Sequence, residues 1–383
     1  MIYKASDNII SSLGFSSKEN YNAVKNGISG LQKFDKKFEI PEPFIASLID
    51  DNKLSVEFGK INHSPNIKYT RLEKATILSV YNAINQTNIN PSDKNLLFIF
   101  SSTKGNVELL EGKNNFEPER IFLWRSAQLI AEYFGNTNEP LIVSNACISG
   151  VAAQITAARY LNSGKYKHVV VVGADVLSKF IVSGFQSFKA LSSDICKPFD
   201  KDRTGLNLGE AAATIIYSVA EKDSEIPKNS LVIESGAIRN DANHISGPSR
   251  TGEGLFTAIS ETIRDIDKTT ISFINAHGTA TPYNDDMESI AIGRANFENI
   301  PVNALKGHFG HTLGAAGIVE TIISGYALSE NIILPTFGFE NLGVANPINV
   351  NKTLSTSDKP RFLKLASGFG GVNAAVVLSK HTR

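Results

Sequence analysis

Cys147 is the residue of this chain whose position most clearly suggests chemistry. It lies in the run Asn-Ala-Cys-Ile-Ser-Gly (145–150), where an apolar strand is predicted to end and a helix to begin. The positive end of a helix favours the thiolate form of a cysteine, and therefore nucleophilic reactions. Because small neighbours also leave space around the sulfur, we expect a nucleophile here rather than one more buried thiol.

Two segments further along the chain contain histidines that would complete such a site. His277 lies in Asn-Ala-His-Gly-Thr-Ala-Thr-Pro (275–282), and His311 ends the run Lys-Gly-His-Phe-Gly-His (306–311). A cysteine with two imidazoles predicts covalent catalysis at a Cys-His-His site. The alternative is a zinc site, which would need a fourth ligand and is disfavoured because the chain has no Cys-x-x-Cys or His-x-x-x-His pair.

The amino-acid composition argues against nucleic-acid-binding, membrane-spanning and disulfide-rich proteins. Lysine plus arginine (38) equals aspartate plus glutamate (38), which gives no indication of a nucleic-acid or membrane partner. Two cysteines are too few for a disulfide framework, and we interpret Cys196, in a loop without a histidine partner, as structural or incidental. No apolar run approaches roughly 18 residues, the length of a membrane span. We therefore expect a soluble, cytoplasmic protein without membrane insertion.

The elements that would position these residues alternate between strands and helices, which predicts an α/β fold in two halves. The polar segment 220–229 separates an N-terminal half (1–220) with the cysteine from a C-terminal half (230–383) with the histidines. The predicted strands are 96–101, 141–145, 168–173, 212–219, 271–275, 301–305 and 364–367, and the predicted helices are 150–162 and 255–266. Each candidate catalytic group follows a strand, where open α/β sheets place their sites.

Four segments together resemble the signatures of the elongating β-ketoacyl-[acyl carrier protein] synthases of the thiolase superfamily. They are the cysteine run, the two histidine runs and Gly-Phe-Gly-Gly-Val-Asn (368–373). The resemblance implies a thiolase-like fold, with two similar α/β halves in a five-layered αβαβα arrangement and assembly as a dimer. It also implies an acyl carrier protein as partner. The phosphopantetheine would arrive on that carrier, with no cofactor or metal on the enzyme itself.

The same resemblance implies a role for each main site residue. Cys147 would take the acyl chain, while the backbone N–H groups of Cys147 and Phe369 would form an oxyanion hole. His277 and His311 would stabilise the enolate formed as malonyl-carrier protein loses carbon dioxide, and Lys306 would order the site electrostatically. Phe369 would also gate the pocket, because its glycine neighbours allow the loop to move.

Further residues match binding positions of the family. Glu288 resembles a buried acid near the lysine, with a solvated carboxylate at a helix start as the alternative. The remaining assignments are the pantetheine-facing Thr279, Thr281, His244 and Ser246, and a loosely similar carrier-docking pair, Lys68 and Arg71.

Three departures from the family pattern leave the pathway open. The opening strand runs into Asp7 and Asn8, which predicts a trimmed amino-terminal edge, and the segment 102–141 looks short. Lys104 falls where many relatives carry a small or aliphatic residue beside the acyl tunnel. Because a buried unpaired ammonium is costly, we expect a shortened or polar tunnel. These features leave both fatty acid synthesis and a specialised polyketide or polyene pathway open.

Two other functions remain as alternatives. The first is a chain-length-factor-like subunit that shapes the tunnel of a partner synthase, against which the intact Cys147, His277 and His311 argue. The second is a thiolase that condenses without decarboxylation and uses a cysteine in place of one histidine. The second histidine favours decarboxylation. The sequence does not distinguish a homodimer from a heterodimer with a degenerate paralogue.

Overall fold

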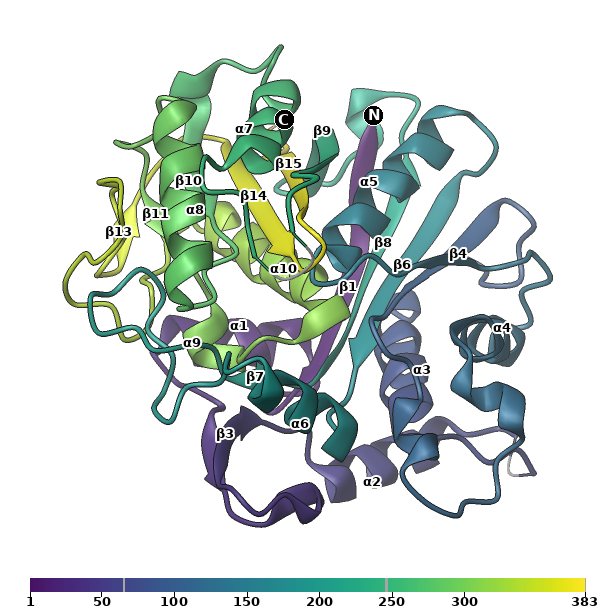
Figure 1. Cartoon of the computed structure of the whole chain (residues 1–383). Coiled ribbons are helices and arrows are strands. Elements are labelled where there is room, and N and C mark those ends of the chain that lie inside the picture. The colour runs from purple at the N-terminus through teal and green to yellow at the C-terminus, as the bar shows by residue number, and fades with distance from the viewer. Residues whose placement is uncertain (65, 245–246, 383) are drawn as a thin grey trace.

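The computed structural model describes residues 1–64, 66–244 and 247–382. Its main feature is a ten-stranded mixed sheet in the order β11-β10-β14-β15-β9-β1-β8-β6-β4-β5 (Figure 1). The five strands of the first half are β1 (Ile2–Ser11), β4 (Leu96–Ser101), β5 (Leu141–Val143), β6 (His168–Asp175) and β8 (Ala211–Val219). The five of the second half are β9 (Leu231–Asn240), β10 (Ile271–Asn275), β11 (Val302–Asn303), β14 (Arg361–Gly368) and β15 (Val372–Lys380).

The two halves of the sheet repeat one topology. Outward from the centre, β1-β8-β6-β4-β5 has two antiparallel pairings followed by two parallel ones. The series β9-β15-β14-β10-β11 has the same directions in the same order. The halves meet where Tyr3 of β1 pairs with Val232 of β9. Two similar α/β halves, as the resemblance implied, are therefore present.

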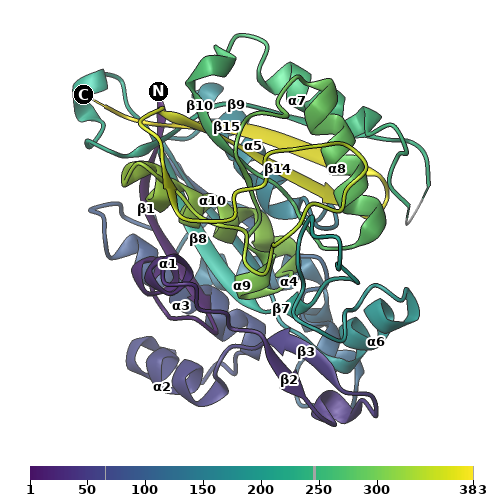
Figure 2. The same ribbon diagram turned by 90° about the vertical axis from the view of Figure 1, so that its left-hand side faces the viewer.

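Helices form the other layers. Helices α5 (Ser149–Asn162) and α10 (Ala316–Ser329) lie in the central core between the two halves of the sheet (Figures 1 and 2). Helices α3 (Arg71–Ile84) and α4 (Leu123–Tyr133) cover the outer face of the first half. Helices α7 (Glu253–Thr262) and α8 (Pro282–Arg294) cover that of the second half. The order helix, sheet, helix, sheet, helix confirms the predicted five layers.

The two central helices approach each other at backbone distance near their amino-terminal ends. A Cβ atom on Gly150 would lie 2.9 Å from the Gly314 carbonyl oxygen, and one on Gly317 would lie 2.6 Å from the Val151 nitrogen. Only glycine fits such contacts. Because Cys147 precedes α5 and His311 precedes α10, this contact fixes the two segments relative to each other.

Smaller elements surround this frame. Strands β2 (Gln32–Phe34), β3 (Phe44–Ser47) and β7 (Leu208–Gly209) form a three-stranded sheet, and β12 (Ile332–Ile333) pairs with β13 (Ser355–Thr356). The remaining α-helices are α1 (Ser17–Lys25), α2 (Asp51–Ile61), α6 (Lys179–Ser187) and α9 (Lys306–Phe309). Within the described ranges, no helix combines the length and the apolar character needed to cross a membrane.

Most of the predicted elements are present, and the structure adds a strand at the amino terminus that was not among the predicted ranges. The strands predicted at 96–101 and 271–275 match β4 and β10, whereas the strand predicted at 301–305 is reduced to β11. The trimmed amino-terminal edge, which is a comparison with the family, stays a prediction. Residues 2–11 form β1 at the centre of the sheet, so the opening strand continues through Asp7 and Asn8. Its polar residues obscured the strand pattern, yet Asp7 is buried and forms an ion pair with Lys4.

Candidate active site

Cys147 lies in a tight turn between β5 and α5. Ala146, just before it, has a positive φ of 45°, an uncommon conformation for a residue with a side chain. The Ser149 hydroxyl fixes the turn, because it accepts from the Asn145 N–H at 2.8 Å and donates to the Ala146 carbonyl at 2.6 Å. The sequence correctly placed the thiol between a strand and a helix.

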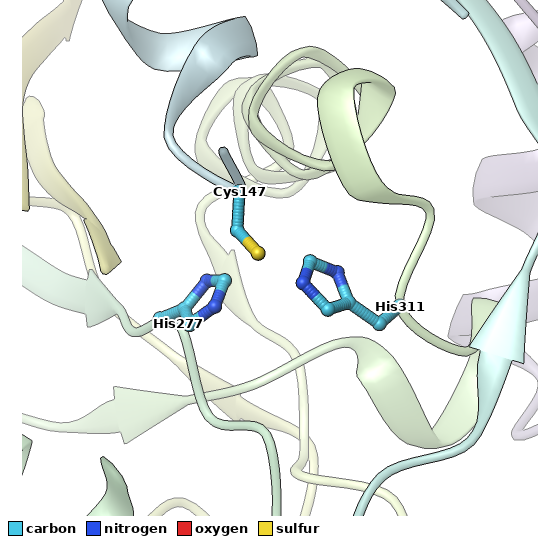
Figure 3. A group of neighbouring side chains, drawn as sticks. All are labelled: Cys147, His277 and His311. Carbon is cyan, nitrogen blue, oxygen red and sulfur yellow. The ribbon is translucent and has the colours of Figure 1, made fainter. Parts of the chain in front are cut away.

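The structure brings the predicted cysteine and histidines together. The Cys147 sulfur and a ring nitrogen of each of His277 and His311 all lie within 4.8 Å of one another, and all three residues are buried. Figure 3 shows the sulfur pointing between the two rings, whose centroids are 5.1 Å apart and whose planes are nearly perpendicular. His277 follows β10 and His311 follows α9, so the first half supplies the thiol and the second half both imidazoles.

Neighbouring donors fix the tautomer of each ring. The Lys306 ammonium lies 3.3 Å from Nδ1 of His277, and the Leu313 N–H donates to Nδ1 of His311 at 3.3 Å. A neutral imidazole whose Nδ1 accepts carries its proton on Nε2. Nε2 of His311 is buried and has no hydrogen-bond partner among the described residues. The site therefore holds imidazole N–H donors for an incoming oxygen.

Burial sets the protonation of all three groups. It lowers the pKa of His277 and of His311 well below the usual 6.5, and the Lys306 charge lowers both further. Burial raises the pKa of the Cys147 thiol to about 11, although the Lys306 charge and the Phe369 backbone N–H act in the opposite direction. Burial thus outweighs the helix terminus that was predicted to favour a thiolate. At neutral pH the site contains a thiol and two neutral imidazoles.

A network of buried charges holds His277 in place. The Lys306 ammonium donates to the His277 carbonyl and lies 2.7 Å from Glu320 of α10. Glu288 of α8 accepts the backbone N–H groups of His277 and Gly278, each at 2.7 Å. Glu288 is fully buried, so its alternative interpretation as a solvated carboxylate is wrong.

The sequence interpretation missed three acidic or basic members of this network. Lys364 of β14 lies 2.6 Å from the second carboxylate oxygen of Glu320. Burial acts to raise the pKa of Glu320, but the two lysine charges outweigh it and lower that pKa. Asp285 of α8 accepts the Thr279 N–H at 3.1 Å, and burial raises its pKa to about 7. The sequence feature that could have identified Glu320 and Lys364 is a single charged residue inside an apolar segment, because charged residues are rarely buried unless they are paired.

A cavity of about 530 Å³ opens onto the cysteine and the histidines. Its lining includes the predicted binding residues Thr279, Thr281 and His244, and the hydroxyls of the two threonines are 2.8 Å apart. Ser246, the other predicted pantetheine contact, lies outside the described residues. The cavity is large enough for an extended acyl or pantetheine arm.

Phe369 also lines this cavity, directly after β14. The residue is 37% exposed, and its ring is close to those of Phe185 and Phe188, with centroids 6.0 and 5.4 Å away. Gly370 and Gly371, which follow it, both have positive φ. A partly exposed ring beside two glycines can change its position at small cost.

Three predicted binding residues lie away from the cavity lining. The Lys104 side chain is exposed in the single chain, and its backbone N–H donates to Asp175 at 3.3 Å. The Arg71 guanidinium binds both carboxylate oxygens of buried Glu210, so part of its role is structural. Lys68 is exposed. A tunnel role for Lys104 and a docking role for the other two residues stay predictions.

Comparisons with known proteins agree with this geometry. Residues 10–222 match the family described as beta-ketoacyl synthase, N-terminal domain, and residues 231–340 match its C-terminal domain. A 3-oxoacyl-[acyl-carrier-protein] synthase 2 of Rhizobium meliloti is 31% identical over 63% of this chain and 60% of its own length.

Solved structures show the same fold. The ishigamide ketosynthase/chain length factor has a TM-score of 0.87 at 24% identity, covering 100% of this chain and 99% of the other. The ketosynthase ApeO of Xenorhabdus doucetiae, solved in complex with its chain length factor ApeC, has a TM-score of 0.86 at 23% identity, covering 99% and 98%. The fold is thiolase-like, and the chain belongs to the β-ketoacyl synthase family.

Proposed function

We propose that this chain is a β-ketoacyl-[acyl carrier protein] synthase that condenses an acyl thioester with malonyl-acyl carrier protein and releases carbon dioxide. The observation that supports this most is the pairing of one buried thiol with two neutral imidazoles in one cavity. Cys147 is the nucleophile, and His277 and His311 stabilise negative charge on the malonyl thioester. Metal chemistry has no part in this proposal.

Acyl transfer comes first. The Cys147 sulfur attacks the thioester carbonyl of the acyl carrier, the new carbon–sulfur bond forms, and the carrier thiol leaves. Because the pKa of Cys147 is about 11, its proton must leave as the sulfur attacks, and neither imidazole accepts it, since Nε2 already carries a proton and Nδ1 faces a donor. The proton ends on the departing carrier thiolate. The backbone N–H groups of Cys147 and Phe369 stabilise the oxyanion.

Condensation follows on the second carrier. The malonyl carbon–carbon bond breaks, carbon dioxide leaves, and the electron pair becomes an enolate on the thioester. The Nε2 protons of His277 and His311 donate to the enolate oxygen, which needs the neutral tautomers that Lys306 and Leu313 fix. The enolate carbon then attacks the acyl-cysteine carbonyl, and the Cys147 thiolate leaves. Thr279 and Thr281 bind the pantetheine arm during both steps.

The partners are an acyl carrier protein and a second ketosynthase-like chain. Strand β5 pairs with β4 on one side and has no partner strand on its outer edge among the described residues. Ile142 on β5 is 37% exposed, Phe122 just before α4 is 56% exposed and Trp124 in α4 is 49% exposed. An open edge next to apolar side chains favours strand pairing with another subunit. Mass measurement in solution, together with Ile142→Asp, tests this assembly. A monomeric parent protein would contradict it.

The activity is tested with Cys147→Ala and the matched control Cys196→Ala. Cys147→Ala should lose all acyl transfer but retain some decarboxylation of malonyl-carrier protein, because both histidines remain. Cys196 is the other buried cysteine and lies outside the cavity lining, so Cys196→Ala should still form the acyl-enzyme. Equal condensation by parent and Cys147→Ala would exclude the nucleophile. The mass of the acyl group trapped on Cys147 distinguishes fatty acid from polyketide or polyene substrates.

A further inference from the structure

Lys364 is a fully buried lysine to which the mechanism above gives no role. It lies on β14 opposite Asn275 of β10, at the strand end that leads to His277. Its ammonium is 2.6 Å from Glu320 and 3.3 Å from the Ala276 carbonyl oxygen. A buried ammonium is costly unless it is paired, so its presence this close to reacting groups calls for a reason.

Four buried charges surround the backbone of His277. The Ala276 carbonyl is bound by Lys364 and the His277 carbonyl by Lys306. Glu288 binds the N–H groups of His277 and of the next residue. Glu320 binds the two lysines, one with each oxygen. In this set two ammonium groups face two carboxylates, and loss of Lys364 would leave Glu320 with Lys306 as its single ammonium partner.

We propose that Lys364 is a positioning residue that balances the second carboxylate and, through Glu320, holds Lys306 against Nδ1 of His277. It thereby keeps His277 as a neutral donor through Nε2. Lys364 does not touch substrate and acts only through its neighbours. This inference rests on the proposed function for its kinetic consequence, but its effect on His277 can be measured without any substrate.

The electrostatics of the site agree with this role. Burial is the main reason that the pKa of His277 lies far below 6.5, and the charges of Lys306, His311 and Lys364 lower it further. Removing the Lys364 charge should therefore raise the pKa of His277. The titratable groups that face the imidazoles from the surrounding elements are Cys147, Asp285, Glu288, Lys306, Glu320 and Lys364.

The main experiment compares Lys364→Met with the double variant Lys364→Met/Glu320→Gln. Methionine keeps the length of the side chain without its charge, and the glutamine in the double variant restores charge balance while still accepting from Lys306. The control is Lys380→Met on the adjacent strand β15, a partly exposed lysine whose ammonium donates to the Asn331 side chain.

The first measurement is the pH dependence of malonyl-carrier decarboxylation. Neutral imidazoles are the active form, so activity falls on acidification through their pKa. Lys364→Met should move this acidic limb to higher pH by on the order of one unit, the usual effect of one nearby charge. The double variant should return it towards the parent value, and Lys380→Met should not move it. A purely structural role would lower the activity or the unfolding temperature without moving the limb.

The second measurement follows the His277 imidazole by NMR in ¹⁵N-histidine-labelled protein, with assignment from His277→Gln. The pKa of His277 should rise in Lys364→Met and fall back in the double variant. This result holds even if the parent does not condense malonyl-carrier protein, which would refute the proposed function alone. An unchanged His277 titration in Lys364→Met overturns the positioning role. If Lys364→Met does not fold, a double variant that is unfolded or keeps a raised His277 pKa also overturns it.

Discussion

Replacement of Glu320 by alanine is the most direct test of the buried charge network. Glu320 is 4% exposed and is the carboxylate that Lys306 and Lys364 share, at 2.7 and 2.6 Å. Glu320→Ala leaves two buried ammonium groups around a cavity. Removing one partner of a buried ion pair costs about 3–5 kcal/mol. Burial already lowers the pKa of Lys364, so that lysine can release its proton and limit the loss to this range.

Thermal unfolding followed by circular dichroism measures the effect. At about 2 °C per kcal/mol for a large chain, Glu320→Ala should lower the unfolding temperature by roughly 6–10 °C. Glu320→Gln, which keeps the acceptor oxygen, should lower it less. The control Glu57→Ala removes an exposed ion pair with Lys60 on α2, and such pairs contribute at most about 1 kcal/mol.

The pKa shift of Glu320 predicts in which direction its contribution to stability changes with pH. The folded-state pKa of Glu320 lies below its usual 4.5, so the ionised carboxylate stabilises the fold above the unfolded-state pKa. That stability is lost as the pH falls through the lower, folded-state value. The difference between parent and Glu320→Ala should therefore be complete at neutral pH and shrink on acidification below about 4.5. A loss no larger than that of Glu57→Ala, or one that persists in acid, would refute the reasoning.

Three further predictions concern the reaction. His311→Ala should leave acyl transfer to Cys147 measurable but stop carbon dioxide release; a variant that decarboxylates but cannot be acylated would reverse these roles. Alkylation of Cys147 by iodoacetamide should rise about tenfold per pH unit towards its pKa of about 11, and a plateau below about pH 9 would show an activated thiolate. Lys104→Ile should lengthen the saturated chains accepted, with acetyl-range activity kept; identical chain-length profiles would exclude Lys104 from the tunnel.

The sequence predicted the reactive groups better than the groups that hold them. Cys147 and His277 each follow an apolar strand that periodicity identifies, and resemblance to one family suggested that they meet. Lys364 and Glu320 were missed because each is one charge inside an apolar segment, and pattern reasoning assigns such segments to the core by their majority. Lys364 and Glu320 are 44 residues apart in the chain, so only the fold shows that the two charges form an ion pair.

Strand β1 was not among the predicted strands for a related reason. A strand in the middle of a sheet is expected to be apolar, yet Asp7 and Asn8 are buried there. Asp7 is accommodated because Lys4, three residues earlier on the same strand, forms an ion pair with it. A strand prediction based on the pattern of apolar residues does not show that one buried polar side chain can be paired with a neighbouring one.

The glycine contact between α5 and α10 sets the distance between the catalytic groups of the two halves. The thiol and the imidazoles belong to different halves, so the gap that a substrate carbon must bridge is set by how closely Gly150 and Gly317 let the two helices approach. A single methyl group added at either glycine would push the two helices apart and widen that gap, although neither glycine lines the cavity. Turnover is sensitive to such misplacement of reacting groups. The reaction rate should therefore fall when the two halves pack less closely against each other.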